Sequence, residues 1–265
     1  MSDTSTEVHA DTIPLQKWLI RLGLGSKRDV RRWIRDGEVL VEGEICTRYA
    51  ELVTPETCIE VSGVEVGTPP EPLVWLMNKP KKHITGRSDP KGRPTLDPYL
   101  PQELPRLFHV GRLDYNTEGV LLWTNDGQLA RRILHPDSHL PKVYRVKIRG
   151  ILEPTDPGLE AMRAGMDLGD FVSRPCPVTV ITYRSRATWV EIVLTQGRYR
   201  QIRRMCAKAR FQIVKLRRIA IGPIELGELN PRCVRPLTHD ELNELRASVD
   251  LPPLPPSVAD DAPET

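Results

Sequence analysis

The sequence of 265 residues has no long apolar run, and its first residues lack the form of a secretion signal. A helix that crosses a membrane needs about 20 consecutive, mostly apolar residues, and no stretch comes near that length. A signal peptide begins with basic residues and continues into an apolar segment, whereas residues 1–12 are polar and acidic. We therefore expect a cytoplasmic protein that makes no contact with a membrane.

Paired cysteines are also missing. None of the five cysteines forms a C-x-x-C pair or stands at metal-ligand spacing from a histidine. An odd number of dispersed cysteines is typical of buried thiols in a reducing compartment. We expect no metal site, and structural roles for Cys46, Cys58, Cys176, Cys206 and Cys233.

Basic residues are absent from both ends of the chain. Residues 1–12 carry a net charge of −3 and residues 248–265 carry −4, so the +3 of the whole chain leaves +10 on residues 13–247. A region this basic favours a polyanionic partner. Charge alone is equally consistent with a soluble basic surface that binds nothing in particular.

Proline and polar residues divide the chain into five segments. We predict disordered tails at residues 1–11 and 248–265, the second of which is rich in proline and acidic residues. Residues 67–72 contain three prolines and form a stiff linker. The linker joins a small basic module at 12–66 to a larger body at 73–247.

The small module is predicted to fold as two helices followed by a β-hairpin. Apolar residues recur at helical spacing over residues 15–22, and Gly23 is a suitable C-terminal stop. Ser26 begins a second helix, with Asp29 three residues later as the partner in a capping box. Residues 38–46, EVLVEGEIC, have the pattern of two short strands joined by a tight turn.

Residues 15–45, LQKWLIRLGLGSKRDVRRWIRDGEVLVEGEI, resemble an S4 RNA-binding domain. In that family the second helix and the loop after it contact RNA phosphates, and guanidinium groups suit this role because they make forked contacts with phosphate oxygens. The plain alternative is a solvated helix face. The resemblance implies RNA binding by the five bases on the exposed face of the second helix: Lys27, Arg28, Arg31, Arg32 and Arg35.

The larger body mixes strand-like and helical patterns without a strict β-α-β rhythm. This mixture predicts an α+β fold with a mixed, largely antiparallel sheet. Strand-like runs lie at 73–80, 106–111, 119–124, 142–148, 177–183, 189–194 and 213–221, and helical patterns lie at 127–135, 157–165, 199–209 and 238–246.

One stretch of the body, GRLDYNTEGVLLWTNDG at residues 111–127, places a carboxylate in an unusual setting. Asp114 lies beside Arg112 in a turn of small and polar residues, and an apolar strand follows at once. A carboxylate at the edge of a buried strand is a rigid acidic group that is suited to catalysis. Position alone favours a turn-forming role, which is the commoner use of aspartate in loops.

The same stretch resembles the signature of the pseudouridine synthases of the RsuA and RluB branch. The resemblance continues in NKPKKHITGRSDPKGRPTL, HPDSHLPKVYRVKI and TQGRYRQIRRMCAKARFQIVKLRRIAIG, and an N-terminal S4 domain is typical of the branch. It implies that Asp114 is the catalytic aspartate, that Tyr144 lies against the target base, and that Arg203 pairs with the aspartate.

The chemistry of the reaction suits these three residues. Conversion of uridine to pseudouridine breaks the C1′–N1 bond and forms a C1′–C5 bond without adding or removing atoms, so we expect no cofactor. An ionised carboxylate is needed, and an adjacent guanidinium favours the charged form of a buried acid. Tyr144 offers a flat surface that holds the detached uracil.

The nucleotide must be flipped out of folded RNA to reach such a site. Arg112 is a candidate to hold the displaced backbone or to fill the gap, and a structural pairing is an equally good interpretation. Between Gln196 and Arg218 there are nine bases and no acid, which predicts a phosphate-binding track beside the site. Its members are Arg198, Arg200, Arg203, Arg204, Lys208, Arg210, Lys215, Arg217 and Arg218.

Taken together, these patterns predict a monomeric RNA pseudouridine synthase that acts on ribosomal RNA or on a ribosome assembly intermediate. The stretch DPKGRPTL and the S4-like module are closer to RluB-type enzymes of the 23S large-subunit RNA than to RsuA-type enzymes of the 16S RNA. The alternative from another class is a non-catalytic S4 protein of ribosome assembly. A third interpretation, a fragment of an aminoacyl-tRNA synthetase, lacks a nucleotide-binding signature.

Overall fold

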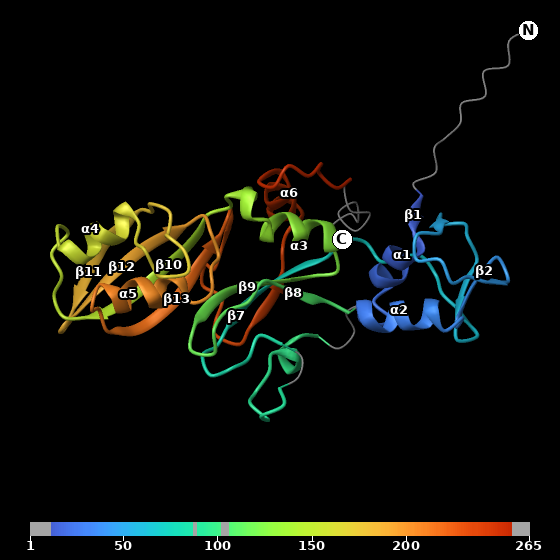
Figure 1. Ribbon diagram of the computed structural model, residues 1–265, viewed down its shortest axis with the longest axis horizontal. Helices are drawn as coiled ribbons and strands as arrows, with labels where there is room; N and C mark the ends of the chain where they lie inside the picture. The colour runs from blue at the N-terminus through green and yellow to red at the C-terminus, as the bar shows by residue number, and fades with distance from the viewer. Residues whose placement is uncertain (1–11, 87–88, 102–105, 256–265) are drawn as a thin grey trace, which may run out of the picture. The chain divides into compact units, whose positions relative to one another are not determined.

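The computed structural model describes residues 12–86, 89–101 and 106–255, and Figure 1 shows the course of the chain. The chain forms two compact units, and along the sequence the main boundary between them falls between Pro72 and Leu73. Residues 106–108 also belong to the first unit. The tail predicted at residues 1–11 lies outside the described residues.

The first unit has the predicted order of two helices and a hairpin. Helix α1 (Leu15–Leu22) ends at Gly23, whose φ of 74° is readily adopted only by glycine. Helix α2 (Lys27–Arg35) begins with the predicted capping box between Ser26 and Asp29. The strands are β1 (Ile13–Pro14), β2 (Val39–Val41), β3 (Glu44–Ile45), β4 (Leu52–Val53), β5 (Ile59–Val61) and β6 (Val64–Glu65). They pair as a sheet of order β3-β2-β5-β6 and a separate β1-β4 pair.

The core of the first unit is formed by the apolar stripes of its two helices. Leu15 and Leu19 of α1 and Val30 and Ile34 of α2 are all fully buried and pack against the small sheet. Because the apolar side of α2 is used in this way, its basic residues are left on the opposite, solvated side.

The second unit is built on one mixed, largely antiparallel sheet, as predicted. The order of its main strands is β11-β12-β10-β13-β9-β7-β15, and only the central β9-β13 contact is parallel. The strands are β7 (Val74–Lys79), β8 (Phe108–Val110), β9 (Glu118–Thr124), β10 (Lys142–Arg149), β11 (Val178–Arg184), β12 (Ala187–Leu194), β13 (Ile213–Ile221), β14 (Ile224–Glu225) and β15 (Val234–Pro236). The helices are α3 (Gly127–Leu134), α4 (Pro157–Ala164), α5 (Gln201–Lys208) and α6 (His239–Ala247), with short 3₁₀ turns η1 (Asp97–Tyr99) and η2 (Pro136–Ser138).

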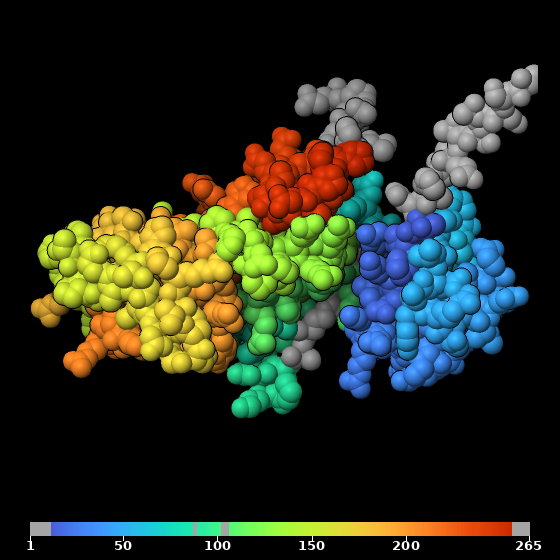
Figure 2. Space-filling view, turned by 45° about the horizontal axis from the view of Figure 1, so that its top comes forward, coloured from blue at the N-terminus to red at the C-terminus, as the bar shows by residue number. Residues whose placement is uncertain are grey.

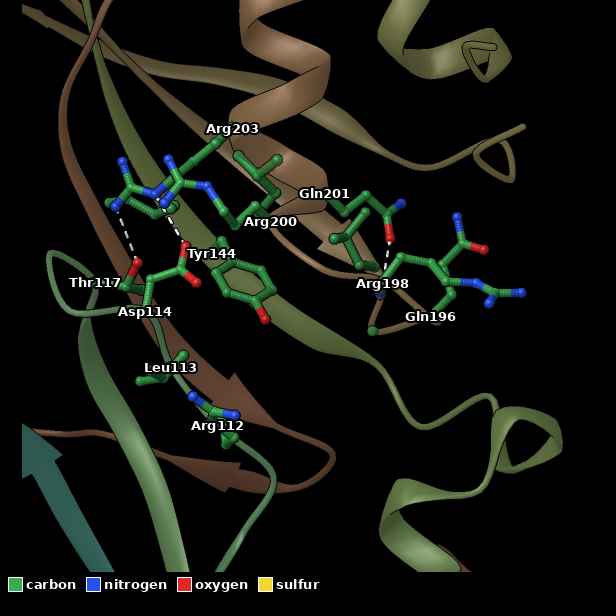
Figure 3. Close-up of a pocket in the computed structure, with 14 residues that line it drawn as sticks. Arg112, Leu113, Asp114, Thr117, Tyr144, Gln196, Arg198, Arg200, Gln201 and Arg203 are labelled. Atoms are coloured by element: carbon green, nitrogen blue, oxygen red, sulfur yellow. Dashed lines mark hydrogen bonds and ion pairs between the residues drawn. The ribbon is translucent and has the colours of Figure 1, made fainter. Parts of the chain in front are cut away.

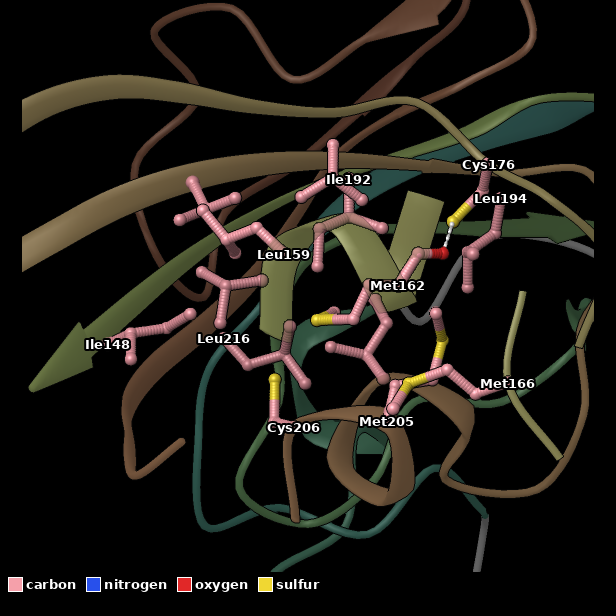
Figure 4. Close-up of a cluster of buried hydrophobic side chains, with 14 residues drawn as sticks. Ile148, Leu159, Met162, Met166, Cys176, Ile192, Leu194, Met205, Cys206 and Leu216 are labelled. Carbon is pink, nitrogen blue, oxygen red and sulfur yellow. Dashed lines mark hydrogen bonds between the residues drawn. The ribbon is translucent and has the colours of Figure 1, made fainter. Parts of the chain in front are cut away.

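One face of the β10–β13 part of this sheet is covered by α4 and α5. Leu159 and Met162 of α4 and Met205 of α5 are fully buried among side chains of the strands, including Ile148 (Figure 4). This packing fixes the position of α5. The N-terminal end of α5 is therefore held rigidly over the sheet.

Residues 248–255, which follow α6, are held by defined contacts, whereas the sequence predicted a disordered tail from residue 248; the rest of that predicted tail lies outside the described residues. The amide of Leu251 donates to the carbonyl of Arg246 at 3.0 Å, and the guanidinium of Arg246 donates to the carbonyl of Pro252 at 2.7 Å. Arg246 also forms a buried ion pair with Asp126, the N-cap of α3, at 3.0 Å. Figure 2 shows the resulting contact of α6 with α3. The proline and acidic residues of this segment indicated disorder, but its apolar residues Val249 and Leu251 are both buried.

The prediction of buried cysteines is wrong for two of the five. Cys58 and Cys233 are exposed, whereas Cys46, Cys176 and Cys206 are buried. Burial raises the pKa of the Cys206 thiol to about 12. Within the described ranges, no helix is long and apolar enough to span a membrane.

Candidate active site

Asp114 lies in the turn that leads into β9, and hydrogen bonds hold the backbone on both sides of it. The hydroxyl of Thr85 donates to the carbonyl of Leu113 at 2.9 Å and accepts from the Leu113 amide at 3.2 Å. The amide of Thr117 donates to the carbonyl of Asp114 at 3.0 Å. The carboxylate is therefore carried by a defined backbone and not by a loose loop.

Lys79 supports the same turn from the protein interior. Its side chain is fully buried, and its amine donates to the carbonyls of Pro80, Asp114 and Thr117 at 2.9, 3.3 and 3.1 Å. Burial lowers the pKa of Lys79 to about 8, although the nearby carboxylates of Asp114 and Glu118 act in the opposite direction. The three contacts tie the end of β7 to both ends of the turn that carries Asp114.

Gly119 allows the two central strands to meet behind Asp114. Its φ is 105°, and a Cβ at this position would overlap the carbonyl oxygen of Arg218 on β13. The parallel contact of β9 with β13 pairs Gly119 directly with Arg218. Glycine is required at this position, because only glycine combines this backbone conformation with so close an approach.

Arg203 of α5 contacts the carboxylate of Asp114. Its Nε donates to Oδ2 of Asp114 at 3.1 Å, and its Nη2 donates to the hydroxyl of Thr117 at 3.0 Å and to the carbonyl of Asn116 at 3.1 Å. The side chains of Asp114 and Arg203 are 28% and 20% exposed, so the pair is sheltered and yet reachable from solvent. The guanidinium thereby orients the carboxylate and supplies its counter-charge.

Tyr144 projects from β10 into the same space. It is half-buried and stands in register with Arg218 of β13, next to a β-bulge between Val143 and Tyr144. Bulges change the direction of a neighbouring side chain. Figure 3 shows the ring beside the Asp114 carboxylate and below the guanidinium of Arg203. Within the described parts of the chain, no protein group bonds to the Tyr144 hydroxyl, which is thus available to a ligand.

These residues line one pocket. Its wall combines apolar side chains, such as Leu194 and Leu216, with the Asp114–Arg203 pair. Such a pocket can hold a flat, partly apolar ring against Tyr144, with a carboxylate beside it. The complete lining is Arg112, Leu113, Asp114, Thr117, Tyr144, Leu194, Gln196, Gly197, Arg198, Arg200, Gln201, Ile202, Arg203 and Leu216.

Comparison with known proteins identifies the family. Residues 73–208 match the family described as RNA pseudouridylate synthase, and residues 13–57 match the S4 domain. The chain belongs to the RNA pseudouridylate synthase family. An RNA pseudouridine synthase of Aquifex aeolicus is 38% identical over 92% of this chain and 97% of its own length.

Two further similarities agree with this assignment. The ribosomal large subunit pseudouridine synthase B of Bacillus subtilis is 32% identical over 89% of this chain and 96% of its own length. A crystal structure of a pseudouridylate synthase superposes with a TM-score of 0.61, at 27% identity, and covers 88% of this chain and 99% of that one. The predicted S4 and synthase folds are both confirmed, and enzymes of this family are isomerases.

The structure divides the predicted RNA-binding arginines of the synthase unit into two groups. Arg112, Arg198 and Arg200 line the pocket, and Figure 3 shows Arg112 on the other side of Tyr144 from Arg200. Arg204 does not line it. Its guanidinium is bonded to Asp170 and to the carbonyl of Leu168, so a structural role accounts for it.

The predicted track of nine bases is not one continuous surface. Arg218 is buried, with its Nε donating to the carbonyl of Val120 at 2.9 Å. Lys215 forms an ion pair with Glu118 at 2.9 Å, and Lys208 is bonded to the carbonyl of Asp167. Successive residues of β13 point to opposite faces of the sheet, so its bases cannot all face one strand of RNA.

The S4 unit carries its own basic patch. The five bases predicted from α2 line a shallow hollow with Asp29 and Tyr49. Arg31 lies 5.1 Å from the centre of the Tyr49 ring, and Arg35 forms an exposed ion pair with Asp36. The hollow, which we call the α2 patch, is lined by Lys27, Arg28, Asp29, Arg31, Arg32, Arg35 and Tyr49.

The residues that position the Asp114 turn are not predicted from the sequence. The sequence pattern places Lys79 only in a strand, and it gives no role to Thr85. A signal for Lys79 is present, because a lysine at the end of an otherwise apolar run must be paired in the interior. Thr85 gives no such signal, since its partner Leu113 lies far along the chain.

Proposed function

We propose that this protein converts one uridine of the 23S ribosomal RNA to pseudouridine. The observation that carries the proposal is the Asp114–Arg203 pair on the wall of a pocket that also contains Tyr144. Two relatives named ribosomal large subunit pseudouridine synthase B, from Bacillus subtilis and Pseudomonas aeruginosa, are 32% and 34% identical to this chain. These names favour the large subunit over the 16S alternative.

In the proposed reaction Asp114 supplies the ionised carboxylate, as nucleophile or as base. The C1′–N1 bond breaks, the uracil turns within the pocket, and a C1′–C5 bond forms. C5 then loses its hydrogen as a proton and N1 gains one, so the composition of the RNA is unchanged. Arg203 keeps Asp114 oriented through the bond from its Nε to Oδ2 of the carboxylate, and the other carboxylate oxygen is proposed to face the bound uridine.

Tyr144 has two proposed tasks in this reaction. Its ring stacks on the detached uracil and retains it, and its hydroxyl removes the C5 proton in the final step. We predict that Tyr144→Phe stalls after the C1′–C5 bond has formed, since the ring is kept and only the hydroxyl is lost. Release of tritium from [5-³H]uridine RNA measures the last step, and full release by Tyr144→Phe would exclude the role of the hydroxyl.

RNA reaches the site by base flipping, with Arg112 proposed to hold the displaced backbone or to fill the gap. The α2 patch is proposed to bind the phosphates of the same RNA or of a ribosome assembly intermediate. We further propose that the enzyme acts as a monomer in the cytoplasm. A non-catalytic S4 protein offers no account of a carboxylate that is held at the wall of a basic pocket, where it would weaken RNA binding.

The proposal is tested by mapping pseudouridine in ribosomal RNA with carbodiimide chemistry. Cells that lack the gene should lose one modification in the 23S RNA. The native gene should restore it, and a gene carrying Asp114→Asn should not. Loss of a 16S modification would favour the RsuA-like alternative, and restoration by Asp114→Asn would remove Asp114 from the mechanism.

A further inference from the structure

Tyr199 is the most exposed of the large apolar side chains among the described residues, with 78% of its surface in water. It lies in the segment 196–201, and the remaining five residues of that segment all line the proposed catalytic pocket. The backbone of Tyr199 therefore lies at the rim of the pocket, and its ring is exposed to solvent. An aromatic ring left in water contributes no burial energy to folding, so packing does not explain a tyrosine at this position.

The backbone on both sides of Tyr199 is held in place. The amide of Arg198 donates to the side chain of Gln201 at 3.4 Å, and the guanidinium of Arg198 lies 5.6 Å from the centre of the Phe171 ring. Arg200 adopts a left-handed conformation, with φ of 49°, as the N-cap of α5. The backbone on both sides of Tyr199 is thus well defined, and the Tyr199 side chain is exposed to solvent.

The charge around Tyr199 is suited to a nucleic acid. Of the described residues that line the pocket, Asp114 is the sole carboxylate, whereas four are arginines. Two of these arginines, Arg198 and Arg200, flank Tyr199 directly in the sequence. Positive groups that follow a backbone, interleaved with an exposed aromatic ring, are the pattern by which proteins hold unpaired nucleotides, whose bases stack on the ring.

Base flipping creates a need for such a ring. A uridine that enters the pocket leaves its neighbours in the strand without one stacking partner. We propose that Tyr199 stacks on a nucleobase next to the flipped uridine, and that it thereby favours RNA in which the strand around the target is unpaired. This inference rests on the proposed function, and it adds a positioning residue that does not touch the reacting atoms.

A binding experiment separates stacking from phosphate contacts. The probes are decauridylate and an abasic decamer with the same ribose-phosphate backbone, both titrated against the full-length protein. Tyr199→Ala should weaken decauridylate binding about tenfold, because one base–aromatic stack is lost. It should leave the abasic decamer and the salt dependence of binding as they are in the native protein, since no phosphate contact has been removed. Tyr199→Phe should bind decauridylate like the native protein.

Tyr183 provides the matched control. It is 43% exposed and lies on β11, the edge strand of the sheet, outside the pocket lining. Tyr183→Ala should bind both probes like the native protein, and circular dichroism should show that all three variants are folded. The inference is overturned if Tyr199→Ala binds decauridylate as tightly as the native protein, or if it loses affinity equally for the abasic probe.

The kinetic prediction is tested on the ribosomal RNA transcript. Tyr199→Ala should act mainly by raising KM, whereas Asp114→Asn should abolish turnover while keeping the preference for decauridylate over the abasic decamer. Failure of the stacking inference therefore leaves the Asp114 result intact. Failure of the proposed function would instead appear as a native protein that forms no pseudouridine in the transcript.

Discussion

At the scale of single residues, the geometry of the site depends on which groups accept hydrogen bonds from the guanidinium of Arg203. One nitrogen holds the carboxylate of Asp114, and another holds Thr117 and Asn116 in the turn behind it. The guanidinium therefore sets both the direction of the carboxylate and the shape of the loop that carries it. A lysine at position 203 has a single nitrogen and could not satisfy both directions with the same geometry.

We predict that Arg203→Gln lowers kcat by about 100-fold or more, because a preorganised charged donor to a reacting group is lost. Tritium release from [5-³H]uridine RNA under saturating conditions measures this. The control is Arg145→Gln. Arg145 lies next to Tyr144 in the sequence and forms a partly exposed ion pair with Glu191 at 3.5 Å. An Arg203→Gln enzyme with a native kcat would show that the ion pair has no part in turnover.

Lys79 gives a prediction for stability and pH. Burial lowers its pKa to about 8, from 10.5 in the unfolded chain. Between these values the unfolded state binds the proton and the folded state does not, so the free energy of unfolding rises with pH across this window. The shift corresponds to at most about 3 kcal/mol. Below pH 8 both states are protonated, and this contribution is absent.

The measurement is urea unfolding at pH 7.5 and at pH 10. Lys79→Met should reduce the increase in unfolding free energy between the two pH values relative to the native protein. Lys142, whose pKa burial also lowers to about 8, provides a second case, and Lys142→Met should remove a separate part of the increase. A native-sized increase in Lys79→Met would mean that Lys79 is charged in the folded protein throughout this range.

At the scale of elements, local patterns in the sequence were sufficient for most of the fold. The capping box at Ser26 and the helical pattern from residue 238 mark the starts of α2 and α6, and the structure has both helices there, each with a capping box. The sequence patterns do not predict the strands β1, β4, β5, β6, β14 and β15, because each has only two or three residues. Some of them are also defined by partners that lie elsewhere in the chain. Val234 of β15, for example, pairs with Met77 of β7, and no local pattern encodes that contact.

The same limit explains the error in the basic track. Asp114, Tyr144 and Arg203 could be identified through the family signature, which carries information on distant contacts. The track of nine bases was predicted only from the spacing of those bases in the sequence. Spacing does not show that Arg218 turns inward to the carbonyl of Val120 or that Lys215 is neutralised by Glu118.

Helix α2 gives the prediction at this scale. The double variant Arg31→Ala, Arg32→Ala should weaken RNA binding and reduce the slope of log affinity against log salt by about 1.4 to 1.8, since each lost phosphate contact contributes about 0.7 to 0.9. Titration at several salt concentrations measures the slope. The control is Arg48→Ala, which removes an exposed arginine of the same unit that pairs with Glu51 and lies outside the α2 patch. An unchanged slope in the double variant would mean that this face is only solvated.

At the scale of the whole molecule, the charge is concentrated where RNA is proposed to bind. Residues 13–247 carry +10 and the two ends carry the balancing acids. Each unit contributes a separate basic surface, one lined by α2 and one at the pocket that contains Asp114 and Arg203. The contacts of Arg31 are made within the first unit and those of Arg203 within the second, so binding and chemistry should respond to mutation independently.

Double-mutant cycles on kcat/KM test this independence. The losses caused by Arg31→Ala and by Arg203→Gln should add in free energy to within about 0.5 kcal/mol, as expected of sites that share no partner. Arg203→Gln combined with Thr117→Val should not add, because the two side chains share a hydrogen bond of 3.0 Å. The second cycle therefore serves as the positive control for coupling. Strong coupling in the first cycle would contradict the proposal that the S4 unit contributes RNA affinity while the Asp114–Arg203 pair contributes to turnover.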